Sequence, residues 1–208
     1  MTSVGLPTEL VEEILSFSWA SSLSIDQRIT LMTCATLVNS TWRAIYLHVS
    51  SRDVYIPCPS FAEHFLRTLE SQSMANRLCR CLTIQIINAT RTAPAETEMP
   101  MERTLASLLY RLYDPSTPLV PNLRRVVVQY HDTGFEGIFN NWSLIAFPRQ
   151  VIELELRYSF SPSMPPWLSE ALRSKHKRQI NRPPWTTPSI RTLTVFGASE
   201  SLVFGVGY

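Results

Sequence analysis

Apolar residues in the first fifty positions recur at spacings of three and four, the period of an α-helix with one buried face. The first such segment opens at Pro7, which suits a first helical position because it has no N–H to leave unpaired. Ser24 and Gln27 have the spacing of a capping box, so a second helix is predicted to begin there. The apolar positions are Leu6, Leu10, Ile14 and Phe17 in the first helix, and Leu31, Cys34, Ala35, Val38, Trp42 and Ile45 in the second.

Beyond residue 52 the pattern changes to short strands that alternate with helical segments. A short apolar run at 53–56 predicts the first strand, and Ser60 with Glu63 predicts a capping box that opens a helix. Four later stretches, at 79–84, 123–128, 151–156 and 190–195, share one spacing and end in a period of two, which predicts strands with one buried face. Helical patterns at 101–113 and 167–180 lie between them. Connections of this length favour parallel pairing of the strands.

The N-terminal pattern resembles the F-box. The matching positions are Leu6, Pro7, Glu9, Leu10, Ile14 and Leu15, followed by Leu31, Cys34, Val38, Trp42 and Arg43. The likeness covers about residues 5–50 and is to F-box-like proteins of the basidiomycete fungal type. It implies a three-helix domain at 1–52 that docks on a Skp-type adaptor, which in turn hangs from a cullin in a ubiquitin ligase. The segment at 19–30 is longer and more polar than the family's loop.

The resemblance also implies which residues contact the adaptor. Leu10 and Trp42 are expected to be the anchors, because large aliphatic and aromatic side chains dominate such interfaces. Some of the candidates must serve the internal core as well. The adaptor-binding candidates are Leu6, Pro7, Leu10, Ile14, Leu15, Leu31, Val38 and Trp42.

The second part of the chain, 53–208, resembles a degenerate leucine-rich-repeat region, in which each strand lines a concave surface. Two of the intervals between its four stretches exceed the roughly 20–29 residues of such repeats, so an ordinary α/β layer is the alternative. The segment 197–208 carries no polar capping helix, and the region is expected to be a shortened one. The expected fold class is therefore α+β, with a helical unit followed by an irregular α/β region of short parallel strands.

Composition narrows the class of partner. Charged residues make up 17% of the chain, below the roughly 25% of typical domains, which suggests surface intended for burial. A net charge of +2 argues against nucleic-acid binding. The absence of a signal peptide and of a long apolar run predicts no membrane association and a location in the cytoplasm and/or nucleus. The partners expected from the resemblance are thus proteins.

Metal and cofactor chemistry is not expected. Cys34, Cys58, Cys79 and Cys81 are predicted to be buried thiols, since a reducing compartment disfavours disulfides. Cys79 and Cys81 are too close in sequence for a zinc knuckle, and no second pair follows. No phosphate-binding glycine loop is present. The chain is therefore expected to hold no metal and no cofactor.

Catalysis is not expected either. His131, Asp132 and Glu136 form the nearest approach to a chemical cluster, and a solvated turn after a strand accounts for them. A basic run at 173–182 has the character of a helix C-terminus. An enzyme centred on His131 is the least favoured of three functional classes.

The resemblance implies a substrate-recognition subunit of a Skp/cullin/F-box ubiquitin ligase. Its N-terminal helices would bind the adaptor, and its repeat-like region would bind a protein substrate. The mechanism would be tethering, which raises the effective concentration of the substrate near the ubiquitin carrier. The alternative is a non-ligase interaction protein whose N-terminal helices only cap the repeats.

Overall fold

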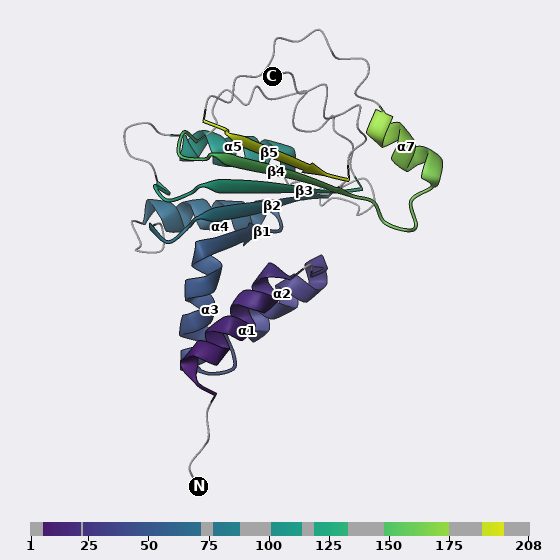
Figure 1. Ribbon diagram of the computed structural model, residues 1–208. Helices are drawn as coiled ribbons and strands as arrows, with labels where there is room; N and C mark the ends of the chain where they lie inside the picture. The colour runs from purple at the N-terminus through teal and green to yellow at the C-terminus, as the bar shows by residue number, and fades with distance from the viewer. Residues whose placement is uncertain are drawn as a thin grey trace.

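The protein has an α+β fold in which a helical bundle precedes a parallel sheet (Figure 1). The computed structural model describes residues 6–21, 23–71, 77–87, 101–113, 119–132, 148–174 and 189–197. Its helices are α1 (Thr8–Ala20), α2 (Ile25–Cys34), α3 (Ser40–Arg52), α4 (Pro59–Glu70), α5 (Met101–Leu112) and α7 (Pro166–Ser174). Its strands are β1 (Asp53–Ile56), β2 (Cys81–Ile87), β3 (Arg125–His131), β4 (Glu153–Ser159) and β5 (Thr192–Phe196). The predicted fold class is thus confirmed.

The N-terminal helices follow the local signals of the sequence, with one correction. The predicted capping box is present, because the Ser24 side chain accepts from the Gln27 N–H and the Gln27 side chain accepts from the Ser24 N–H. The second helix does not continue to Ile45 as predicted: α2 ends at Cys34 and α3 begins after Asn39. The side chain of Asn39 accepts a hydrogen bond of 2.8 Å from the Trp42 N–H and caps α3. An N-cap signal inside an apolar run was therefore missed.

The three helices form a bundle with its own small core. Trp19 of α1 and Tyr46 of α3 meet edge to face with their ring centroids 5.7 Å apart, a favoured aromatic geometry. The helix α3 ends at Arg52 and β1 begins at the next residue. Tyr55 of β1 packs in this core too, so the bundle is joined to the sheet both through the chain and through side chains. The buried members are Val11, Leu15, Trp19, Ala35, Tyr46, Val49 and Tyr55.

The sheet has the strand order β1-β2-β3-β4-β5, and every neighbouring pair is parallel. The four stretches that share one spacing lie in step, because Leu82, Val126, Leu154 and Leu193 are register partners across the strands. Each strand begins two residues after the start of its stretch, and Cys79, Leu123 and Val151 at those starts are buried beneath the strand ends. This strand order follows the chain order, as stacked strand-and-helix units do. In a doubly wound sheet, by contrast, the strand order reverses at a switch point.

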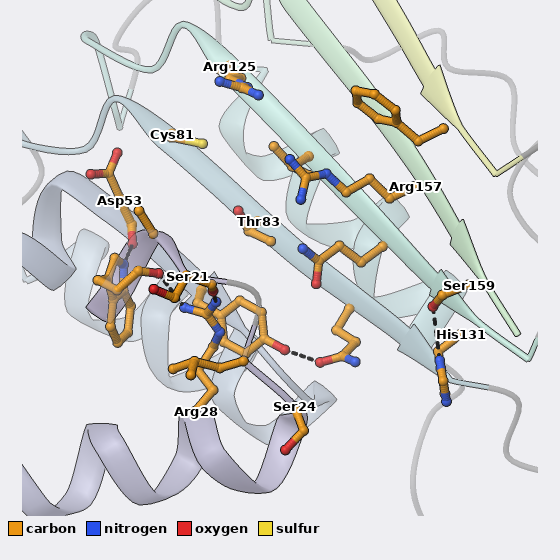
Figure 2. A pocket seen from close by; sticks show the side chains of 18 of the residues that line it. Ser21, Ser24, Arg28, Asp53, Cys81, Thr83, Arg125, His131, Arg157 and Ser159 are labelled. Atoms are coloured by element: carbon orange, nitrogen blue, oxygen red, sulfur yellow. Dashed lines mark hydrogen bonds between the residues drawn. The ribbon is translucent and has the colours of Figure 1, made fainter. Parts of the chain in front are cut away.

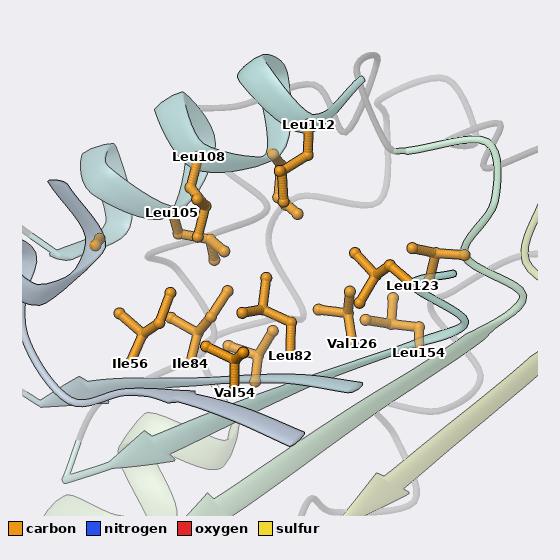
Figure 3. Packing of buried hydrophobic residues seen from close by; sticks show 14 of the residues in the cluster. Val54, Ile56, Leu82, Ile84, Leu105, Leu108, Leu112, Leu123, Val126 and Leu154 are labelled. Carbon is orange, nitrogen blue, oxygen red and sulfur yellow. The ribbon is translucent and has the colours of Figure 1, made fainter. Parts of the chain in front are cut away.

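The main core lies between one face of the sheet and the helices α4 and α5. Figure 3 shows Leu105, Leu108 and Leu112 of α5 pointing at apolar side chains of the strands. Helix α4 adds Ala62, Leu66 and Leu69. The sheet contributes alternate residues of β1 to β4: Val54, Ile56, Leu82, Ile84, Ile86, Val126, Val128, Tyr130, Leu154, Leu156 and Tyr158.

The start of α4 differs from its sequence-based prediction. The predicted capping box at Ser60 is wrong, because the N-cap is Cys58, two residues earlier, Pro59 lies in the first turn and no side chain caps the helix. The helix α7 lies apart from α4 and α5, beyond the ends of the strands (Figure 1). It contributes no residue to the main core cluster of the described chain. Three predicted features lie outside the described residues: the part of the basic run that follows Ser174, the residue Glu136, and the segment 198–208.

We predict that Leu108→Ala destabilises the fold by about 2–5 kcal/mol, because the side chain is fully buried between α5 and the sheet and its loss leaves a cavity. Urea unfolding followed by circular dichroism measures the change. Tyr110→Ala on the exposed side of the same helix is the control, with an expected effect within about 0.5 kcal/mol. Equal effects of the two substitutions would contradict this packing.

Candidate functional site

A polar surface of the sheet faces a groove between the sheet and the bundle (Figure 2). Its floor is the sheet face opposite the main core, and its wall is built from the end of α1 and the start of α2. The groove has a volume of about 970 Å³. Because strand side chains alternate between faces, the same strands supply the apolar core and this polar floor.

Arg28 of α2 closes the groove where bundle and sheet meet. Its Nη1 donates to the Trp19 carbonyl at 2.8 Å and its Nη2 donates to the Ser21 carbonyl at 2.9 Å. These carbonyls end α1, where a cation complements the helix dipole. The guanidinium also lies 4.6 Å from the ring centroid of Tyr55. Arg28 is 9% exposed, and burial lowers its pKa from the ordinary value. Arg28 therefore joins α1, α2 and β1.

Further contacts fix the bundle on the first strands. The Trp19 indole N–H donates to the Asp53 carbonyl at 2.6 Å. The Tyr55 hydroxyl donates to the side-chain carbonyl of Gln85 on β2. Burial raises the pKa of Tyr55, which keeps its hydroxyl protonated as a donor. Trp19 thus joins the groove wall to β1, and the bond between Tyr55 and Gln85 joins β1 to β2.

A cluster of three charged residues lies on the floor at β3 and β4. Glu155 accepts hydrogen bonds from Arg125 and from Arg157, and its side chain is 5% exposed while both arginines remain half-exposed. Burial alone would raise the pKa of Glu155, but the hydrogen bonds from Arg125 and Arg157 outweigh it and hold the pKa below the ordinary value. Arg157 also lies over the ring of Phe196, 5.6 Å from its centroid. The cluster presents two fixed guanidinium groups to the groove.

His131 and Ser159 end neighbouring strands at one end of the groove. His131 Nδ1 and Ser159 Oγ are 2.9 Å apart, and Asp132 Oδ2 lies 3.7 Å from His131 Nε2. Serine, histidine and aspartate are the residues of hydrolase triads. Here, however, Asp132 Oδ1 accepts the Ser161 N–H at 2.6 Å, and the Ser159 hydroxyl also donates to the Tyr130 carbonyl at 3.3 Å. These bonds fasten the strand ends and support the interpretation of this segment as a structural turn.

The four cysteines are free thiols in differing surroundings. Within the described ranges, no three histidine, cysteine or acidic side chains are grouped to hold a metal ion. All four thiols are free, and burial raises the pKa of Cys79 to about 12 and that of Cys81 to about 11. The prediction that every thiol is buried is right for Cys79 and wrong for the others, because Cys34 is exposed at the end of α2 and Cys58 and Cys81 are partly exposed.

The structure divides the adaptor-binding candidates between surface and core. Leu6, Pro7, Leu10, Ile14 and Val38 are exposed. Leu15 is 2% exposed and belongs to the bundle core instead, because it lies on the α1 face that packs against α3. Leu31 and Trp42 are partly buried against the same core. The structure thereby places the more accessible candidates on α1 and on the connection between α2 and α3.

Several residues of both surfaces were missed at the level of sequence. Phe17 and Leu37 are 77% and 80% exposed, yet neither was among the adaptor-binding candidates. The groove residues Arg125, Glu155 and Arg157 carried a usable signal, since they alternate with apolar residues along β3 and β4. That alternation was used to find the buried face, and no site was assigned to the other face.

We predict that Glu155→Gln lowers stability by about 1–3 kcal/mol at pH 7, because a buried carboxylate with two charged donors is lost. The folded-state pKa of Glu155 is depressed, so its contribution is present above the unfolded value near 4.5 and is lost as pH falls through the folded value. Urea unfolding of parent and variant between pH 7 and about pH 3 should show the difference shrinking.

Glu153→Gln is the matched control, since Glu153 is exposed at the start of the same strand. Its stability should stay within about 0.5 kcal/mol of the parent at pH 7. A difference for Glu155→Gln that persists unchanged at pH 3 would contradict the assigned role of the carboxylate.

Comparisons with protein-family models, with curated proteins and with solved structures find no significant match to this chain. Within the described part of the chain, no helix combines the length and the apolar character needed to cross a membrane. Inference about function therefore rests on two surfaces: the exposed apolar residues of the bundle, and the polar groove.

Proposed function

We propose that the protein is a substrate-recognition subunit of a Skp/cullin/F-box ubiquitin ligase. The bundle α1–α3 would bind a Skp-type adaptor, which connects it to a cullin, and the sheet region would bind a protein substrate. The chain itself would perform no chemistry and would act by tethering. The observation that carries the proposal is the row of exposed apolar side chains along α1.

This row is separate from the residues that hold the bundle together. Leu10 and Ile14 are four residues apart and Phe17 follows three residues later, so these three share one side of α1, and Leu6 lies just before the helix begins. The core instead uses Val11, Leu15 and Trp19 from the same helix. Single exposed apolar residues are normal, but a row of large ones on one helix marks an interaction site.

The connection between α2 and α3 adds two more exposed apolar residues, Leu37 and Val38. None of these exposed apolar residues lines the groove, so they are separate from it. Together they are called the apolar face of the bundle: Leu6, Leu10, Ile14, Phe17, Leu37 and Val38. A partner on this face and a ligand in the groove could therefore be held at the same time, as tethering requires.

A second candidate function is a non-ligase interaction protein whose bundle caps the first strand. The contacts of Trp19 and Arg28 with β1 favour it, because they show that the bundle covers this edge of the sheet. Capping alone, however, gives no physical reason for a large apolar residue at each turn on the outer side of α1. The adaptor proposal accounts for both the contacts with β1 and the exposed row.

We predict that the parent chain co-purifies with a fungal Skp-type adaptor and that Leu10→Asp with Ile14→Asp weakens this binding at least about tenfold. Two charges would be placed in an interface whose affinity depends on buried apolar anchors. Both side chains are half-exposed and lie outside the bundle core, so the variant should keep its fold. Biolayer interferometry with immobilised adaptor measures the affinity.

Tyr110→Asp is the control, because Tyr110 is an exposed aromatic residue on α5, outside the bundle. It should bind the adaptor as the parent does. If a folded parent fails to bind, or if the double variant binds equally well, the ligase proposal fails and the capping function becomes the better account.

A further inference from the structure

The groove carries an excess of positive charge in a protein of nearly neutral overall charge. Arg28, Arg52, Arg125 and Arg157 line it, and Asp53 is the lining residue of opposite charge. Arg52 donates to Asp53 at 2.9 Å, and Arg28 is engaged with the carbonyls that end α1. The accessible positive charge of the groove is therefore concentrated at Arg125 and Arg157, which Figure 2 shows side by side on the sheet.

Glu155 holds these two arginines in place without using all of their donors. Arg125 binds it through Nη2 and Arg157 through Nε, whereas a guanidinium has five N–H groups. The carboxylate lies beneath the surface and both guanidinium groups remain half-exposed above it. A ligand carboxylate would therefore meet two donors whose conformations are already fixed, which reduces the entropy lost on binding.

The floor beside the arginines is polar but uncharged. Thr83, Gln85 and Gln129 lie on β2 and β3, and Gln85 and Gln129 are register partners of Arg157 along one row of the sheet. Gln85 is buried and its side-chain carbonyl accepts from Tyr55, whereas Gln129 is partly exposed and presents its amide to the groove. Amide and hydroxyl side chains match the donors and acceptors of an extended peptide backbone.

We propose that this groove binds an extended acidic peptide segment, with an Asp or Glu carboxylate held between Arg125 and Arg157 and the adjoining backbone on Thr83 and Gln129. The inference rests on the proposed function in one respect, since the segment would belong to the substrate that is tethered. The charge pattern selects a peptide rather than a nucleic acid. Asp53 interrupts the cationic lining, and Glu155 beneath the surface already pairs with Arg125 and Arg157, which disfavours a ligand charged along its whole length.

The test is selection of a phage-displayed random dodecapeptide library on the immobilised full chain. Peptides with Asp or Glu should be enriched, and a labelled member should lose at least about tenfold in affinity when its acidic residues become Asn or Gln. The protein variant Arg125→Gln, Glu155→Gln, Arg157→Gln removes the cluster without leaving a buried carboxylate unpaired. It should enrich no acidic peptides.

Arg111→Gln is the matched control, because Arg111 is a half-exposed arginine paired with Glu70 on the helical side of the sheet. It should enrich the same peptides as the parent. Arg125→Gln alone is a milder second variant that leaves Arg157 on Glu155, and it should weaken binding of the labelled peptide several-fold. Circular dichroism and thermal unfolding establish that each variant is folded.

The proposal is overturned if no peptide is enriched, if the enriched peptides are basic or apolar, or if the triple variant enriches acidic peptides as the parent does. It is also overturned if a single-stranded oligonucleotide displaces the labelled peptide at lower concentration than the peptide itself does. Measuring adaptor binding distinguishes failure of the peptide-groove proposal from failure of the ligase proposal. The triple variant should still bind the adaptor, and Leu10→Asp with Ile14→Asp should still enrich acidic peptides.

Discussion

The in-register pairing of five parallel strands is the constraint on which both functional surfaces depend. Because side chains alternate along a strand, pairing without a register shift places every second residue on the same face from β1 to β5. One face collects Leu82, Val126 and Leu154 beneath α4 and α5. The other collects Thr83, Arg125 and Arg157 in the groove. A shift of one residue in β4 would turn Glu155 and Arg157 toward the core and expose Leu154 and Leu156.

The junction at Arg28 adds the wall that turns a polar sheet face into a groove. A buried cation is costly unless its donors are satisfied, and here two carbonyls at the end of α1 and the Tyr55 ring surround it. The same contacts fix the direction in which the bundle leaves the sheet (Figure 1). The bundle can therefore present the outer side of α1 away from the groove while its opposite side packs on α3.

This arrangement suits a protein that connects two partners. In the proposed function, the row of exposed apolar residues on α1 would bind one partner, and the groove with fixed arginines would bind another of different chemistry. The two sites share no residue, and the hydrogen bond from Trp19 to Asp53 joins α1 to β1, so the two sites are separate places on one molecule. Tethering requires such a separation more than it requires catalytic groups.

The sequence by itself determined the elements and their pairing class. The period of three and four predicted the helices, the capping box at Ser24 located the start of α2, and the shared spacing of four stretches predicted parallel strands. These signals are local, because they depend on which face of a helix or strand must be buried. The break between α2 and α3 was missed, since the cap at Asn39 lies within an otherwise continuous apolar period.

The tertiary structure alone decided which apolar residues are accessible and which polar residues meet. Leu10 and Leu15 have the same chemistry, and only the packing of α1 on α3 leaves one exposed and buries the other. Arg28 and Tyr55 are brought together by the bundle's position on β1, and Arg125, Glu155 and Arg157 by the pairing of β3 with β4. Contacts between distant segments depend on how whole elements pack, so no local period of the sequence could specify them.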